Sequence, residues 1–409
     1  MSSLIPQERG FLWDLSDVVN GNPEKDRKPV KNFLNEVNKY PGLLDIMVNI
    51  EGLICRRGVH ASGVVFYDED PFETACFMKA KSGAVTTQYS LHDAEYCSDT
   101  KYDFLVTEVQ DVICQCLELL QENEKIEKDL SLKEIYNQYL HPDKLPIEDK
   151  KIWDVAASGS VLKFFQFDTM IGGQTIRTVK PTNPIEMANC NSAMRLMASE
   201  KCGETPTERI VRMKSDISQW YEEMNNWGLT REEQKILEPY YLPNNATPAQ
   251  QEELMTILMD KDICHFTLAE ANQARKIVAK KQMDKIPELH QKILNQASSS
   301  KLGTYVYETA IKPQLGYSFS RIHSLAYSFI GLQTLYLATY FPSVYWNTAC
   351  LRVDSGLDEE AASNYAKIAK AVGGIVHRGI ELSLIDINKS QYGFEPDEEN
   401  NRIIYGMKA

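Results

Sequence analysis

The order of apolar and polar residues predicts short strands near the start of the chain and helices through most of the rest. In "GVHASGVVFY", residues 58–67, a glycine-rich turn precedes β-branched and aromatic residues, as in a strand. The run "TKYDFLV", residues 100–106, also has the pattern of a strand. Thr107 and Gln110 then match a capping box. Apolar residues follow at helical spacing, at Val109, Val112, Ile113, Cys116 and Leu120. The strand around Asp103 is therefore expected to run directly into a helix.

Farther along, polar breaks separate helical stretches. Residues 142–150, "PDKLPIEDK", form a proline-interrupted break that is typical of a domain boundary. Thr247 is expected to cap a helix, and a second helix is expected over 267–285. A helix over about 358–374 should end at two glycines, and 379–388 has the pattern of a strand. The predicted fold class is α+β, predominantly helical.

Composition and charge exclude several classes of protein. The 409 residues carry a formal net charge of −13, which argues against a surface that is basic throughout. A local basic patch could still bind nucleic acid, because charges farther apart than about 8 Å are largely screened from one another. The nine cysteines and seven histidines are scattered, which argues against a zinc site and favours the reducing cytoplasm. Polar residues interrupt the apolar stretch 325–341, so we expect a core helix there and no membrane association.

The strand around Asp103 carries the first candidate chemistry. Side chains alternate along a strand, so Lys101 and Asp103 should lie on one face. A lysine beside a carboxylate suits a site that binds a metal ion and phosphate. By itself the pattern is more typical of an ion pair on a solvated strand, and both interpretations stay open.

A basic stretch carries the second candidate. Arg275, Lys276, Lys280, Lys281 and Lys285 face only Glu270 and Asp284, for a local net charge of about +3. Like charges four residues apart on a helix repel, which suggests an anionic partner. A solvated helix would explain the pattern equally well.

The third candidate is "GYSFSRIHSLAYS", residues 316–328. Arg321, His323 and Ser324 should lie near a helix N-terminus, which favours anions. A capping serine and a structural histidine are the alternative. His60 is likewise more typical of a structural histidine than of a ligand.

Taken in order, several segments resemble one family. They are "GVHASGVVF", "VTTQYSLHDAEYCSDTKYDFL", "FFQFDTMIGGQTIRTVKP", "TLAEANQARKIVAKK", "GYSFSRIHSLAYSFIGLQTLYLATYFP", "LIDINKSQYGFEP" and "IIYGMKA". Together they resemble the bacterial replicative DNA polymerase III α subunit, a family C DNA polymerase, from about residue 50 to the end. The resemblance implies part of a mixed-sheet, nucleotidyltransferase-like palm over 1–141 and helical fingers over 142–345. Residues 346–409 would then lead toward a helix-hairpin-helix region.

The resemblance also assigns roles to residues. Asp103 falls on the third metal-binding aspartate of the family and Lys101 on its neighbouring lysine, so both are expected to be catalytic. The expected nucleotide- and DNA-binding residues are His60, Arg57, Gln166, Lys180, Arg195, Arg275, Lys276, Lys280, Lys281, Arg321, His323 and Ser324. The implied cofactor is a pair of Mg²⁺ ions. The implied partners are dNTPs, primer-template DNA, a sliding clamp and other replisome proteins.

The sequence departs from the family at important positions. The paired palm aspartates should precede His60, but the Asp-x-Asp pattern near it, "YDEDPF" at residues 67–72, follows His60. Arg195 is followed by Leu-Met-Ala, where the family usually has Pro-Gly-Pro, and Arg321 stands where the family usually has lysine. One carboxylate should bind Mg²⁺ weakly.

We therefore expect a DNA-directed DNA polymerase that is inactive as an isolated chain and is completed by a second polymerase chain. A segment of a longer reading frame would look the same. A non-catalytic module that binds primer-template or a replisome protein is the main alternative. A metal-dependent phosphoesterase that uses His60 and Asp103 is another. The expected location is the cytoplasm, or the host cytoplasm for a phage-encoded protein.

Overall fold

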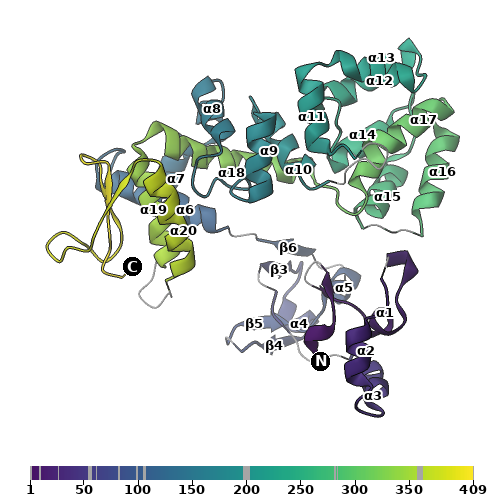
Figure 1. Ribbon diagram of the computed structural model, residues 1–409, viewed down its shortest axis with the longest axis horizontal. Helices are drawn as coiled ribbons and strands as arrows, with labels where there is room; N and C mark the ends of the chain where they lie inside the picture. Colours follow the sequence, from purple (N-terminus) through teal and green to yellow (C-terminus); the bar gives the residue numbers. More distant parts are fainter. Residues whose placement is uncertain are drawn as a thin grey trace. The chain divides into compact units, whose positions relative to one another are not determined.

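The computed structural model describes residues 2–8, 11–25, 27–53, 58–60, 62–81, 83–97, 100–104, 107–196, 203–280, 282, 284–356 and 363–408. By packing, the chain divides into a first unit, Met1–Val106, and a second unit, Thr107–Ala409. Each is described by itself (Figure 1). Helices dominate and the sheets are small, which confirms the predicted class.

The first unit begins with a small helical layer. Helices α1 (Leu15–Asn20), α2 (Lys31–Val37) and α3 (Leu43–Ile50) follow a two-stranded ribbon of β1 (Gln7–Glu8) and β2 (Phe11–Leu12). The core of this layer consists of Leu15, Val18, Phe33 and Val37, which are all buried. The apolar residues face inward at helical spacing, and this burial stabilises helices that would be too short to form alone.

The rest of the first unit holds two antiparallel strand pairs. Strand β3 (Gly63–Phe66) pairs with β6 (Thr100–Asp103), which places Val65 opposite Lys101 and Gly63 opposite Asp103. Strand β4 (Phe77–Lys79) pairs with β5 (Val85–Thr87). The short helices α4 (Pro71–Thr74) and α5 (Leu91–Tyr96) connect them. Both predicted strands are confirmed within the described residues.

The second unit is helical and ends in a three-stranded sheet. Its helices are α6 (Glu108–Glu122), α7 (Leu132–Ile135), α8 (Lys150–Ser158), α9 (Met170–Val179), α10 (Pro184–Ala193), α11 (Pro206–Ser215), α12 (Ser218–Asn226), α13 (Arg231–Tyr241), α14 (Gln251–Met259), α15 (Leu268–Ala279), α16 (Ile286–Gln296), α17 (Ser300–Val306), α18 (Arg321–Tyr340), α19 (Ser343–Ser355) and α20 (Tyr365–His377). In the sheet, β9 (Arg402–Ile404) lies between β7 (Glu381–Ser383), to which it is parallel, and β8 (Glu395–Asp397), to which it is antiparallel.

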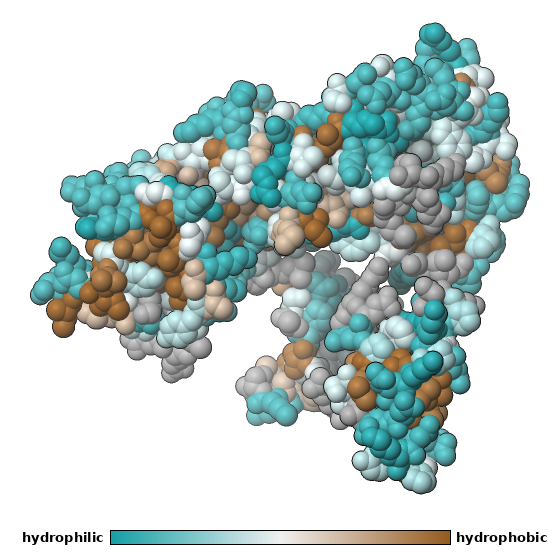
Figure 2. Space-filling view, in the orientation of Figure 1, coloured by the Kyte–Doolittle hydropathy of each residue, from teal (hydrophilic) through white to brown (hydrophobic). Residues whose placement is uncertain are grey.

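Three apolar clusters hold the second unit together. One joins α11–α17 around Trp220, Tyr241 and Tyr305. Another packs α6 against α19 and α20 and continues under the terminal sheet. The third lies between α8–α10 and the long helix α18. On the face shown in Figure 2, hydrophilic side chains predominate, and hydrophobic side chains lie between them.

Helix α18 is a core helix, as predicted. Two of its buried polar side chains are satisfied inside the protein: Gln333 donates to the carbonyl of Leu140 at 2.9 Å, and Thr334 donates to the carbonyl of Gly331 at 2.6 Å. Within the described part of the chain, no helix combines the length and apolar character needed to cross a bilayer. The seven described cysteines are free thiols. The cytoplasmic location stays a prediction.

Several predicted element ends were wrong. The helix expected over 267–285 ends at Ala279, so Lys280 and Lys285 lie outside it. Gln250 precedes α14 at the N-cap position, rather than Thr247. Helix α20 continues to His377 through the two glycines expected to end it, because Ile368, Ala371 and Ile375 are buried in the core.

Packing also divides the chain differently from the expected domains. Helix α6 buries Val112, Cys116 and Leu120 in the cluster that it shares with α19, so residues after 107 belong to the second unit. The sequence placed residues 1–141 in the palm. The assignment of 107–141 to palm or fingers, and the boundaries at 142 and 346, stay predictions.

Candidate functional site

Lys101 and Asp103 form the centre of the site in the first unit. Strand β6 turns both side chains to one face, and Lys101 Nζ donates a hydrogen bond to Asp103 Oδ1. This bond lowers the pKa of Asp103, so its carboxylate is ionised at neutral pH. The Asp103 side chain is 46% exposed, whereas that of Lys101 is 17% exposed. The carboxylate is therefore accessible and charged.

Gly63, on the neighbouring strand β3, leaves space for the side chain of Lys101. A Cβ atom at this position would lie 2.6 Å from Lys101 Cε and 3.0 Å from His60 Nδ1. The lysine stem therefore crosses the strand pair where glycine leaves space. This close approach could not be predicted from the sequence, because it depends on the register of the two strands.

His60 lies beside Asp103, and its Nδ1 is bonded to the backbone. Its Nδ1 accepts hydrogen bonds from the backbone N–H groups of Ser62 (3.1 Å) and Gly63 (2.8 Å). Nδ1 lies 3.8 Å from Asp103 Oδ1. Because the Nδ1 lone pair is used by these donors, the neutral ring carries its proton on Nε2. In this structure His60 fixes the turn before β3, and among the described residues its Nε2 has no hydrogen-bond partner.

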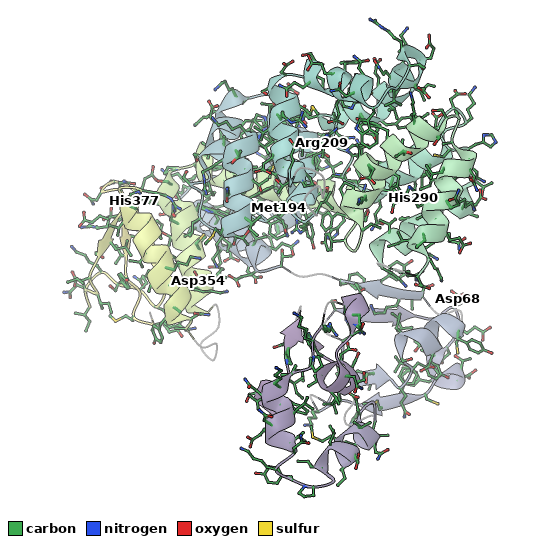
Figure 3. The ribbon with its side chains drawn as sticks, turned by 45° about the vertical axis from the view of Figure 1, so that its right-hand side comes forward. Asp68, Met194, Arg209, His290, Asp354 and His377 are labelled. Atoms are coloured by element: carbon green, nitrogen blue, oxygen red, sulfur yellow. The ribbon has the colours of Figure 1, made fainter. Side chains whose placement is uncertain are left out.

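The described residues of the first unit do not form a complete metal site. No group of three or more histidine, cysteine, aspartate or glutamate side chains suited to a metal ion is found in the described part of the chain. In the acidic turn at 67–72, Asp70 Oδ1 accepts from the backbone N–H of Phe72 at 2.9 Å and caps α4. Figure 3 labels Asp68 in this turn. Asp103 alone, with an ammonium group bound to it, does not fit the six oxygen ligands that Mg²⁺ prefers.

In the second unit, three predicted residues lie close together: Gln166, Arg195 and His323. Arg195 Nη2 donates to Gln166 Oε1 at 2.6 Å, and its guanidinium lies over the Phe319 ring, 5.0 Å from the centroid. His323 packs on Phe319 (ring centroids 5.1 Å apart) and on Tyr327 (3.9 Å apart). We call Gln166, Arg195, Phe319, His323 and Tyr327 the Arg195 cluster.

Burial lowers the pKa values of Arg195 and His323, the two titratable members of the Arg195 cluster whose side chains can carry positive charge. Desolvation lowers the pKa of Arg195 from its ordinary value. Burial, together with the nearby Arg195 charge, lowers the pKa of His323, so its ring is neutral at physiological pH. A cation on an aromatic platform beside a neutral histidine can bind a phosphate or stack on a base. Phe319 and Tyr327 lie in the segment 316–328, but neither was predicted from the sequence to be a site residue.

The N-terminus of α18 was expected to bind an anion, but a carboxylate of the protein itself, that of Glu252, occupies this position. Glu252 accepts hydrogen bonds from the backbone N–H of Arg321 (2.6 Å) and from Ser320 Oγ (2.7 Å). The first turn of α18 is therefore capped by the protein's own carboxylate. Ser324 is fully buried; its Oγ donates to the carbonyl of Ala188 at 3.2 Å and accepts from Gln250 Nε2 at 3.1 Å. In this structure Ser324 belongs to the core, and the Arg321 side chain is exposed.

The remaining predicted residues are not members of the Arg195 cluster, and two of them are outside the described residues. Arg275 donates to Asn272 Oδ1 and to Gln251 Oε1, which fixes its guanidinium. Lys276, Lys280 and Lys180 are exposed. Lys180 follows α9 in the left-handed region, at φ 49°. Arg57 and Lys281 lie outside the described residues. Helix α15 ends at Ala279, so Lys276 is its last lysine and Lys280 follows it at the C-cap position.

Comparison with known families gives the context for this geometry. Residues 1–106 match the bacterial DNA polymerase III alpha NTPase domain, and residues 110–301 match the bacterial DNA polymerase III alpha subunit finger domain. The chain belongs to the DNA polymerase III α-subunit family. The two matched segments meet at the division between the two packing units.

Curated relatives of the DNA polymerase III α-subunit family match the whole chain. The probable DNA polymerase YorL of Bacillus subtilis (strain 168) is 41% identical over 422 residues, covering 100% of this chain and 32% of YorL. The DNA-directed DNA polymerase of Bacillus phage SPbeta matches to the same extent. The DNA polymerase III subunit alpha of Thermus aquaticus is 23% identical over 413 residues, covering 100% of this chain and 31% of that subunit. The chain therefore spans about a third of the length of these relatives.

Proposed function

We propose that the chain supplies part of the active site of a DNA-directed DNA polymerase. The observation that carries this proposal is the accessible, ionised Asp103 held beside Lys101 on β6 in a chain of this family. Asp103 would be one of the carboxylates of a two-Mg²⁺ site, and the Lys101 ammonium would lie beside the bound phosphates. The relatives named as DNA polymerases support the reaction class.

The other carboxylates of this site would come from outside these 409 residues. We propose a second polymerase chain as their source, and a longer chain that contains this sequence is the alternative. When complete, such a two-metal site stabilises charge on the attacking and leaving oxygens of an in-line displacement. The strand pair β3–β6 supports docking of further structure, because neither strand has another partner in the described residues. Val64, Phe66 and Tyr102 on this pair are exposed apolar side chains.

The second unit would bind dNTPs and primer-template DNA. The Arg195 cluster offers a cation and aromatic faces for phosphate and base. Lys276 and Lys280 offer exposed positive charge. A sliding clamp and other replisome proteins are proposed as further partners by analogy with the family.

The test is primer extension by the native complex. Tagged chain is purified from its own cells with the proteins that accompany it, and the complex is assayed with primer-template, dNTPs and Mg²⁺. Asp103→Asn should lower the rate at least about a thousandfold, as expected when a charge-stabilising group is removed. Asp68→Asn, which changes an acid in the 67–72 turn, is the matched control and should retain activity. Equal activity of the Asp103→Asn and wild-type complexes would refute the proposal.

A non-catalytic module is the second candidate, favoured by the incomplete metal site. It predicts that primer-template binding survives Asp103→Asn and that no accompanying chain brings polymerase activity. Phosphodiester hydrolysis by the chain alone, without dNTPs, would instead indicate the phosphoesterase. That alternative is weakened because His60 Nδ1 is already bonded to the backbone.

A further inference from the structure

The first turn of α14 holds the segment that carries Phe319, a member of the Arg195 cluster. Gln250 and Phe319 form an isolated parallel β-bridge, and the backbone N–H of Gln251 donates to the carbonyl of Phe319 at 2.9 Å. The Gln251 side chain also donates to the carbonyl of the residue before Phe319. We call residues 250–253 the α14 clasp, because they grip this turn through its backbone.

Further hydrogen bonds extend the α14 clasp onto α18. The Glu252 carboxylate accepts from Ser320 Oγ at 2.7 Å and from the backbone N–H of Arg321 at 2.6 Å. Gln250 Nε2 donates to Ser324 Oγ at 3.1 Å, and both of these side chains are fully buried. The start of α18 and the turn before it are therefore held by a helix that lies far away in the sequence.

Glu253, the last residue of the clasp, is a buried carboxyl group that the protein satisfies only in part. The residue is 5% exposed. Its Oε2 accepts from the backbone N–H groups of Ala249 and Gln250, whereas its Oε1 is buried and has no hydrogen-bond partner among the described residues. An ionised carboxylate at this position would keep one oxygen away from both water and donors, which is unfavourable.

The charged groups around Glu253 do not offset its burial. The Glu252 carboxylate raises the pKa of Glu253, and Arg321 on α18 lowers it. Arg275 on α15 is engaged elsewhere, because it donates to Gln251 Oε1 at 2.9 Å. The α10 side chains that are bonded to the clasp carry no charge. Burial is the largest effect, and it raises the pKa of Glu253 to about 7.

Loss of the Glu253 proton would work against the closed clasp in two ways. The new charge would be buried with one oxygen unbonded, so it would gain hydration if the clasp opened. It would also repel the Glu252 carboxylate, whose hydrogen bonds hold Ser320 and Arg321. The closed arrangement therefore retains the proton, and the open arrangement releases it to water.

We propose that the α14 clasp is a proton-sensitive positioning device for Phe319. With Glu253 protonated the clasp is closed and holds the Phe319 ring against Arg195. With Glu253 ionised the clasp opens more often and releases this turn. Gln251, Glu252 and Glu253 are positioning residues that act through Phe319. The effect of the clasp on a ligand of the Arg195 cluster rests on the proposed function, but the clasp itself does not.

The test is amide hydrogen exchange of the full chain, measured by mass spectrometry and corrected for the intrinsic exchange rate at each pH. Between the pKa values of Glu253 in the open and closed states, each pH unit changes the opening equilibrium up to about tenfold. Protection of residues 317–324 should therefore fall at least about tenfold from pH 5 to pH 7.5 and then level off. Glu253→Gln cannot ionise, so its protection should not depend on pH.

Two neighbouring charges give a sharper test, because they should move the pH dependence in opposite directions. Glu252→Gln removes a repulsion from ionised Glu253, so protection should stop falling at a lower pH than in the wild type. Arg321→Gln removes an attraction, so protection should stop falling at a higher pH. General destabilisation cannot produce shifts of opposite sign.

Glu288→Gln is the matched control, because Glu288 is an exposed carboxylate in the first turn of α16. It should show the wild-type dependence on pH. Asp103→Asn should show it too, so failure of this proposal can be distinguished from failure of the polymerase proposal. The proposal is wrong if Glu253→Gln keeps the wild-type dependence, or if the wild type shows none.

Discussion

The guanidinium of Arg195 lies over the ring of Phe319, 5.0 Å from its centroid, while it donates to Gln166. These residues come from three separate segments, so the contact ties α10 to the turn before α9 and to the start of α18. Arginine can stack the face of its guanidinium on an aromatic ring while the N–H groups at the guanidinium edge donate hydrogen bonds. Lysine cannot do both at once.

Arg195→Lys should therefore lower the free energy of unfolding by about 1–3 kcal/mol, since Gln166 and Asn191 lose a donor. Urea unfolding followed by circular dichroism measures this. Arg231→Lys, at an exposed position in the first turn of α13, is the control and should change stability little. Equal unfolding midpoints for both variants would show that the stacked arrangement contributes nothing.

A buried ion pair in the Trp220 cluster supports a second prediction. Arg209 Nη1 and Nη2 lie 2.6 and 2.7 Å from the two Glu223 oxygens, and Tyr305 also donates to Glu223 at 2.9 Å. Figure 3 labels Arg209. Arg209→Met should lower the free energy of unfolding by about 3–5 kcal/mol, because it removes both close cationic donors from a largely buried carboxylate and leaves Arg212 Nη2, at 3.7 Å, as the nearest cation.

The double variant Arg209→Met, Glu223→Met should recover most of that loss, because no unpaired charge remains. Denaturant unfolding of the four members of this cycle gives the coupling directly. Burial, the largest single effect, raises the pKa of Glu223, but the hydrogen bonds and charges of Arg209, Tyr305 and Arg212 together lower it overall. The pair should therefore stabilise the fold above the ordinary carboxyl pKa and lose that contribution as the pH falls. Additive losses in the double variant would contradict this account.

Glu253 should make the free energy of unfolding depend on pH in the direction opposite to that of the Arg209–Glu223 pair. Its Oε2 accepts from the backbone N–H groups of Ala249 (2.8 Å) and Gln250 (3.1 Å), yet burial dominates and raises its pKa to about 7. The folded state therefore keeps a proton that the unfolded chain releases near pH 4.5. Stability should fall as the pH rises from about 4.5 to 7, because the unfolded state then binds fewer protons.

Glu253→Gln keeps an acceptor for both backbone donors and cannot ionise. The difference in unfolding free energy between this variant and the wild type should grow in favour of the variant between pH 5 and pH 7.5, by roughly 1–3 kcal/mol. Urea unfolding at the two pH values measures it. A difference that is constant with pH would show that Glu253 titrates normally.

Gly63 supports a prediction about Asp103. Gly63→Ala would place a methyl group 2.6 Å from Lys101 Cε and should push the ammonium away from the carboxylate without changing any charge. The pKa of Asp103 should then rise toward its ordinary value, since its hydrogen bond to Lys101 is the main cause of its lowering. Carboxyl-carbon NMR titration of Asp103 measures this shift. Gly58→Ala, where nothing lies within 4 Å of the new Cβ, is the control; an equal effect would refute the steric account.

Local patterns in the sequence determined the strand-to-helix order around Asp103 and the common face of Lys101 and Asp103. Both follow from short-range rules: alternation along a strand and the Thr107–Gln110 capping box, which the structure shows. The family resemblance also came from the order of motifs along the chain. The predominance of helix followed from apolar residues at helical spacing.

Only the tertiary structure decided where helices stop and which distant residues meet. Helix α20 passes through Gly373 and Gly374 because burial of Ile375 outweighs the cost of glycine, about 1 kcal/mol each. Glu252 reaches the start of α18 and takes the place expected for a bound anion. Such contacts depend on how helices pack, and no local period in the sequence encodes that packing.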